Sequence, residues 1–212
     1  MLRPAAYLGG AWATQRLGLD PLAGLLRLSG WWALAFLLAA LSVGALRGLL
    51  AGFARWRPLR HGRRLADWNG LVRARRPLGL SACAYAALHC ALYFMLELDA
   101  DPAALWLELQ EKRYLQWGAA AMLVLLPLAA TSNRWAQQRL GRLWPRLHAA
   151  AYLAAGLALA HDTLQAKPGH EGPWWATGLF TLLLLLRLRG WFNGQNQPTQ
   201  TVQREGLAHR RH

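Results

Sequence analysis

Long apolar segments alternate with arginine-rich polar stretches along this chain. A helix needs about 20 mostly apolar residues to cross the hydrocarbon layer of a membrane, and five segments come close to that length. The five predicted spans run over residues 31–50, 77–98, 114–131, 143–161 and 174–188. A sixth segment, residues 4–12, is short and glycine-rich. The pattern predicts an all-α fold, a polytopic transmembrane helix bundle of five spans with a weak or truncated N-terminal one.

The chain has 212 residues, which leaves room for one domain. We assign residues 1–192 to the membrane domain. Residues 193–212 are polar, have no core of their own, and are predicted to be a disordered cytoplasmic tail. A nucleotide-binding lobe would need considerably more length, so any NAD(P)H chemistry is expected on a partner protein.

The charges predict how the bundle is oriented, because Lys and Arg near span ends are retained on the cytoplasmic side. The region between the first and second spans contains one acidic residue, Asp67. It contains nine arginines: Arg47, Arg55, Arg57, Arg60, Arg63, Arg64, Arg73, Arg75 and Arg76. The next loop is rich in Asp and Glu, and the later loops continue the alternation. The loops and tail therefore read in, out, in, out, in. This placement explains the net charge of +14 without nucleic-acid binding.

Two cysteines, Cys83 and Cys90, lie seven residues apart in one apolar segment. Two small buried side chains are the favoured interpretation over a disulfide or a metal site.

Three of the seven histidines fall within or at the edge of predicted spans: His89, His148 and His161. Polar residues inside a membrane are costly, so each needs a partner or a function. A neutral imidazole can offer one nitrogen to iron while the other donates a hydrogen bond, which suits an axial haem ligand in a helix bundle. A single intramembrane histidine more often bonds a neighbouring helix, and a haem site competes with that interpretation.

Depth in the membrane distinguishes the three histidines. His89 is about 18 Å from the cytoplasmic start of its span at 1.5 Å per residue, and His161 lies near the outer end of another. These two are closest in depth and predict a bis-histidine haem towards the outer half. His148 precedes His161 by 13 residues, a rise of about 20 Å and a rotation that leaves the side chains roughly 140° apart. The two cannot bind the same iron, and facing the same neighbour would require a distortion, for which Gly156 is the candidate.

Three stretches closely resemble the MsrQ family: RARRPLGLSACAYAALHCALYFMLEL, AATSNRWAQQRLGRLWPRLHAAAYLAAGLALAH and LLLLLRLRGWF. That family is the haem-binding membrane subunit of the MsrPQ protein-methionine-sulfoxide reductase system, and it is related to the ferric reductase-like transmembrane domain of NADPH oxidases. The similarity covers residues 20 to 192 in unbroken order.

The resemblance implies a heme b electron-transfer subunit in the bacterial inner membrane. Electrons from a cytosolic flavin reductase or a quinone would reach a periplasmic molybdopterin-containing methionine sulfoxide reductase subunit. The haem histidines of the family correspond to His89, His148 and His161. Family members are also associated with FMN.

The histidine spacing at the cytoplasmic side of the predicted bundle departs from that of the related oxidases. Those proteins place two histidines fourteen residues apart on each of two helices. Fourteen residues before His89 stands Arg75, and fourteen before His161 stands Leu147, beside His148. A guanidinium stays protonated and cannot act as a neutral ligand. Arg75, with Arg76 beside it, is a candidate for pairing with a haem propionate or flavin phosphate; orientation of the chain in the membrane is the alternative.

Two other functions remain open from the sequence. A stand-alone transmembrane ferric or quinone reductase would turn over its substrate without a periplasmic partner. A transporter or proton channel would use the three histidines and Glu97 as a relay without haem.

Overall fold

The computed structural model describes residues 21–56, 69–165 and 174–195. Every regular element in these ranges is a helix, which confirms the predicted all-α fold. In chain order they are α2 (Pro21–Trp56), α4 (Asn69–Leu92), the π-helix η1 (Tyr93–Glu97), α5 (Pro102–Glu111), α6 (Arg113–Ala130), α7 (Arg134–Leu140), α8 (Leu143–Ala149), α9 (Ala151–Gln165) and α10 (Trp174–Gln195). The predicted N-terminal segment 4–12 and residues 196–212 of the predicted tail lie outside the described residues.

Three of the described helices are long and apolar enough to cross a membrane: Leu22–Leu50, Arg73–Glu97 and Arg113–Ala130. The predicted count of five spans is therefore not confirmed. The fourth predicted span is divided between α8 and α9, and α9 alone has 15 residues, fewer than the roughly 20 that a crossing needs. The fifth corresponds to α10, which continues to Gln195, beyond the predicted start of the tail.

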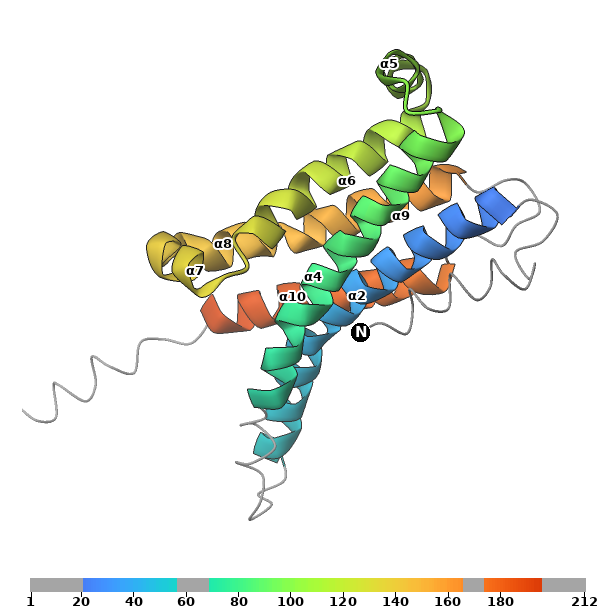
Figure 1. Ribbon diagram of the computed structural model, residues 1–212. Helices are drawn as coiled ribbons and strands as arrows, with labels where there is room; N and C mark the ends of the chain where they lie inside the picture. The colour runs from blue at the N-terminus through green and yellow to red at the C-terminus, as the bar shows by residue number, and fades with distance from the viewer. Residues whose placement is uncertain (1–20, 57–68, 166–173, 196–212) are drawn as a thin grey trace, which may run out of the picture.

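The helices associate mainly as two pairs, α2 with α4 and α6 with α9, while α10 packs against both α2 and α9 (Figure 1). Small side chains lie where the helices meet, because Ala82, Ala154, Ala155 and Ala176 are completely buried. Residues this small let helix backbones approach closely, as in membrane proteins generally. Leucines from several helices fill the space around them.

Large apolar side chains also cover the outside of the bundle. Leu123 on α6 is 70% exposed, and Leu153, Leu182 and Leu185 are each more than half exposed. An extended apolar exterior of this kind marks a surface that is in contact with something other than water. Together with the three long apolar helices, it identifies a membrane protein.

The structure corrects the sequence analysis at two places in these helices. Helix α2 begins at Pro21, ten residues before the predicted span. Cys83 is buried as expected, but Cys90 is exposed, because neighbouring helices cover α4 at the first position and not two turns later. Both cysteines are free.

A short helix, α5, occupies the loop that was predicted to lie outside the membrane. Asp101 is its N-cap, since its carboxylate accepts a hydrogen bond from the backbone N–H of Ala103, at 2.8 Å. Pro102 follows at the first helical position, where a missing N–H costs nothing. In Figure 1 α5 lies beyond the ends of η1 and α6, at one end of the bundle.

Candidate functional site

The imidazoles of His89 and His161 lie together between the two helix pairs. Their ring centroids are 6.0 Å apart and their planes make an angle of 82°. His89 comes from the last turn of α4 and His161 from α9. The two residues that the sequence placed at matching depth are therefore neighbours in space.

The hydrogen bonds of His89 determine which of its nitrogens is free. Its Nδ1 is 2.9 Å from the carbonyl oxygen of Leu26 on α2. A carbonyl can only accept, so Nδ1 carries the hydrogen and the lone pair is on Nε2. The completely buried Ser29 hydroxyl lies 3.2 Å from the same Nδ1 and donates to the same carbonyl. The Nε2 lone pair of His89 is thus available to bind a metal.

His161 has the same arrangement on the other helix pair. Its Nδ1 is 2.7 Å from the carbonyl oxygen of Tyr114 on α6, which again assigns the hydrogen to Nδ1 and the lone pair to Nε2. Ligating histidines in proteins commonly donate their other N–H to a backbone carbonyl in this way, which orients the ring. Both histidines are held as metal ligands usually are.

The separation of the rings suits two ligands on opposite sides of one metal. Imidazole nitrogens bind first-row metals at roughly 2 Å, so two such ligands place their ring centroids about 6 Å apart. The observed 6.0 Å agrees with this arrangement. Within the described ranges no three His, Cys, Asp or Glu side chains cluster as a metal-ion site. Two imidazoles match the two axial positions that a porphyrin leaves for the protein.

His148 is not part of this pair. It lies in α8, where its ring stacks on Trp144 with centroids 4.1 Å apart. Its Nε2 is 3.3 Å from the Thr131 hydroxyl at the end of α6. Arg75, which is exposed, lies within electrostatic range of His148, and Arg76 is exposed beside it. His148, Trp144 and Thr131 thus form a second, separate polar cluster within the electrostatic range of Arg75.

The distortion between His148 and His161 lies at Ala150, and the prediction of Gly156 was wrong. Helix α8 ends at Ala149 and α9 begins at Ala151. Gly156 instead lies within α9, where an added Cβ would be 3.6 Å from the ring of Phe180. That glycine does not break the helix, and an added Cβ would make only an ordinary contact with α10.

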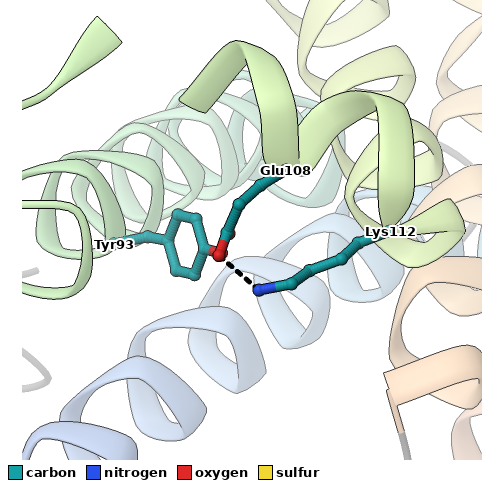
Figure 2. Close-up of polar contacts among 3 residues, drawn as sticks. All are labelled: Tyr93, Glu108 and Lys112. Atoms are coloured by element: carbon teal, nitrogen blue, oxygen red, sulfur yellow. Dashed lines mark hydrogen bonds and ion pairs between the residues drawn. The ribbon is translucent and has the colours of Figure 1, made fainter. Parts of the chain in front are cut away.

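A further polar cluster, which the sequence analysis missed, joins η1 to α5. The Tyr93 hydroxyl donates to the Glu108 carboxylate, and the Lys112 ammonium donates to its other oxygen. Figure 2 shows the side chain of Tyr93 meeting those of Glu108 in α5 and of Lys112, the C-cap of that helix. The spacing of Glu108 and Lys112, four residues apart, was the available signal for an ion pair on a helix.

This cluster predicts how pH affects the hold of α5 on the bundle. Hydrogen bonds from Lys112 and Tyr93 keep the pKa of Glu108 below its ordinary 4.5, and the bond to Glu108 raises the pKa of Lys112 above 10.5. The carboxylate therefore contributes stability above pH 4.5 that is lost as the pH falls through its lowered pKa. The ammonium contributes below pH 10.5 and loses this contribution as the pH rises through its raised pKa.

We expect Glu108→Gln to lower the thermal stability of the detergent-solubilised protein slightly near neutral pH. The difference from the wild type should vanish well below pH 4.5. High salt should also reduce it, because the Lys112 side chain is 38% exposed. A difference that persists unchanged at acidic pH would contradict this account.

Comparison with known proteins agrees with these features. The family described as "Ferric reductase like transmembrane component" matches residues 29–159. A Rhodospirillum rubrum protein named "Protein-methionine-sulfoxide reductase heme-binding subunit MsrQ" is 35% identical over 188 residues, which cover 88% of this chain and 83% of the relative. Proteins of the same name from Brucella ovis and Brucella canis are 31% identical over 205 residues, 97% of this chain and 84% of each relative. No solved structure matches the chain. The chain therefore belongs to the MsrQ family of ferric reductase-like transmembrane proteins.

Proposed function

We propose that this protein is the haem-binding, electron-transferring membrane subunit of a protein-methionine-sulfoxide reductase system. The observation that carries the proposal is the pair of imidazoles from His89 and His161, each with its Nδ1–H on a backbone carbonyl and its Nε2 lone pair free. The relatives named heme-binding subunits support the same cofactor.

In this proposal His89 and His161 would together hold one b-type haem through their Nε2 atoms. When bound, haem supplies a carrier that gains and loses one electron. The carbonyls of Leu26 and Tyr114 hold the ring protons on Nδ1 and keep each Nε2 free for iron. Buried leucines and alanines on the surrounding helices exclude water, and such burial is one of the factors that set a haem potential.

The protein would carry electrons through the bacterial inner membrane as a multi-pass subunit. A cytosolic flavin reductase or a quinone would donate them, and a periplasmic molybdopterin-containing methionine sulfoxide reductase subunit would receive them and reduce the substrate. On the proposed periplasmic side, two tyrosines connect the site with α5. The ring of Tyr114 is 5.9 Å from that of His161, and Tyr93 interacts with Tyr114. An outer exit near α5 is consistent with these contacts.

The cluster of His148, Trp144 and Thr131 is the proposed inner cofactor site. Arg75 on α4 supplies positive charge there, with Arg76 next to it in the sequence, and guanidinium groups bind phosphate or carboxylate through paired hydrogen bonds. This chemistry suits the phosphate of FMN or the propionates of a second haem, for which His148 would be the protein ligand.

An absorption spectrum of the purified protein tests the proposal directly. After expression with sufficient haem, the reduced-minus-oxidised difference should show the bands of a low-spin b-type cytochrome. Haem should be retained through gel filtration in detergent. A protein that folds as a helical monodisperse species and contains no haem would contradict the function.

A stand-alone transmembrane ferric or quinone reductase is the alternative function, favoured by the match to the ferric reductase-like component over residues 29–159. It predicts reduction of ferric chelates or quinones by the purified chain with a chemical electron donor and no periplasmic partner. The electron-transfer subunit instead requires the partner for reduction of methionine sulfoxide.

A further inference from the structure

The ring of His89 lies against a part of the α2 surface that carries no side chain. The ring lies over Gly30 of α2, where an added Cβ would be 3.4 Å from Nδ1 and Cε1. Gly30 stands four residues, about one helical turn, after Leu26, whose carbonyl accepts the Nδ1–H. The glycine therefore leaves bare the stretch of helix surface against which the imidazole lies.

The same arrangement recurs under His161 on the other helix pair. Its ring lies over Gly118 of α6, where an added Cβ would be 2.8 Å from Nδ1 and 3.1 Å from Cε1. Gly118 again stands four residues after the accepting carbonyl, here that of Tyr114. We call each carbonyl and its glycine an imidazole seat: Leu26 with Gly30, and Tyr114 with Gly118.

A seat can fix the plane of the imidazole ring, which the backbone of the histidine leaves free. The torsion that rotates an imidazole about its Cβ–Cγ bond has broad minima, so the helix that carries the histidine leaves the ring plane poorly defined. A hydrogen bond to a carbonyl specifies the direction of Nδ1. The missing glycine side chain gives the ring the room to take that direction.

We propose that Gly118 is a positioning residue, and that the two seats hold the ligating imidazoles with their planes nearly perpendicular. The angle of 82° between the rings is the geometry that results. The inference rests on the proposed function, because ring orientation acts through an iron bound to both histidines. In a low-spin ferric haem, perpendicular imidazoles leave two iron d orbitals nearly equal in energy, whereas parallel ones separate them.

The wild-type protein provides the first test, and it requires no variant. The electron paramagnetic resonance spectrum of the oxidised full-length protein in detergent should show the strongly anisotropic low-spin signal with one very large g value that perpendicular ligands produce. A rhombic spectrum with three resolved, moderate g values would indicate parallel rings and overturn the proposal.

Three alanine variants provide the second test, because the seats differ in how tightly they fit. Gly118→Ala places a methyl group at 2.8 Å from Nδ1 and should displace the His161 ring. Gly30→Ala meets His89 only at 3.4 Å, an ordinary contact, and should have little effect. Gly44 on α2 has nothing within 4 Å of an added Cβ, so Gly44→Ala is the matched control.

We expect Gly118→Ala to shift the largest g value and to bind less haem per chain, while Gly30→Ala and Gly44→Ala keep the wild-type signal. An unchanged signal in Gly118→Ala would overturn the role of that seat. If Gly118→Ala retains too little haem for a spectrum, the wild-type signal decides. A different result would contradict the proposed function itself. The wild-type protein would then contain no haem, or His161→Ala would keep the wild-type electron paramagnetic resonance signal.

Discussion

His161→Ala and His89→Ala are each expected to lose nearly all bound haem. Removing either residue leaves iron with one axial protein ligand in a site built for two. It also leaves the carbonyl of Tyr114 or Leu26 without its imidazole donor. Haem per chain, measured as the pyridine haemochrome of protein purified from haem-replete cells, should fall close to the background of an unrelated membrane protein.

His148→Ala is the matched comparison, because it removes an imidazole from a separate cluster. It should retain part of the haem, together with the low-spin signal of the outer pair. Full retention would remove His148 from the set of ligands. Complete loss in His148→Ala, with retention in His161→Ala, would contradict the paired site. Helical content and monodispersity of each variant separate loss of ligand from loss of fold.

Leu38→Ala is expected to destabilise the bundle by about 2 kcal/mol, near the lower end of the range for buried leucines. Leu38 is 2% exposed and packs with Leu34, Leu159 and Ala176 of three different helices. Lipid is as apolar as leucine, so little transfer energy is lost and the cost comes mainly from the cavity. Unfolding in mixed micelles, followed by circular dichroism, measures the change.

Leu185→Ala on α10 is the control, since Leu185 is 58% exposed and leaves no cavity when truncated. It should unfold at nearly the wild-type denaturant fraction. Equal destabilisation by both substitutions would mean that Leu38 is not in a packed interior, and the arrangement of α2 against α9 and α10 would then be wrong.

The helical content and the meeting of two histidines could be predicted from the sequence for simple reasons. Apolar length predicts spans, and helical rise converts sequence position into depth. His89 and His161 could therefore be matched before any contact was known. The break at Ala150 could not, because alanine favours helix and carries no signal of a helix end. Helix α5 had such signals in Asp101 and Pro102, yet the acidic residues around it suggested a loop.

The seats are invisible to sequence for a different reason. The acceptors are backbone carbonyls, which every residue possesses, so neither Leu26 nor Tyr114 could be singled out. Gly30 and Gly118 are two of 20 glycines. Only the contact with an imidazole distinguishes them, and that contact depends on how α2 crosses α4 and how α6 crosses α9.

One seat belongs to the α2–α4 pair and the other to the α6–α9 pair, so a porphyrin bound between His89 and His161 would hold the two helix pairs together. Anything that binds the assembled state and not its separate parts stabilises it by mass action. Haem supply should therefore govern how much of the protein accumulates in a cell. Where porphyrin synthesis is limiting, the haem-free protein should be the form that membrane proteases degrade.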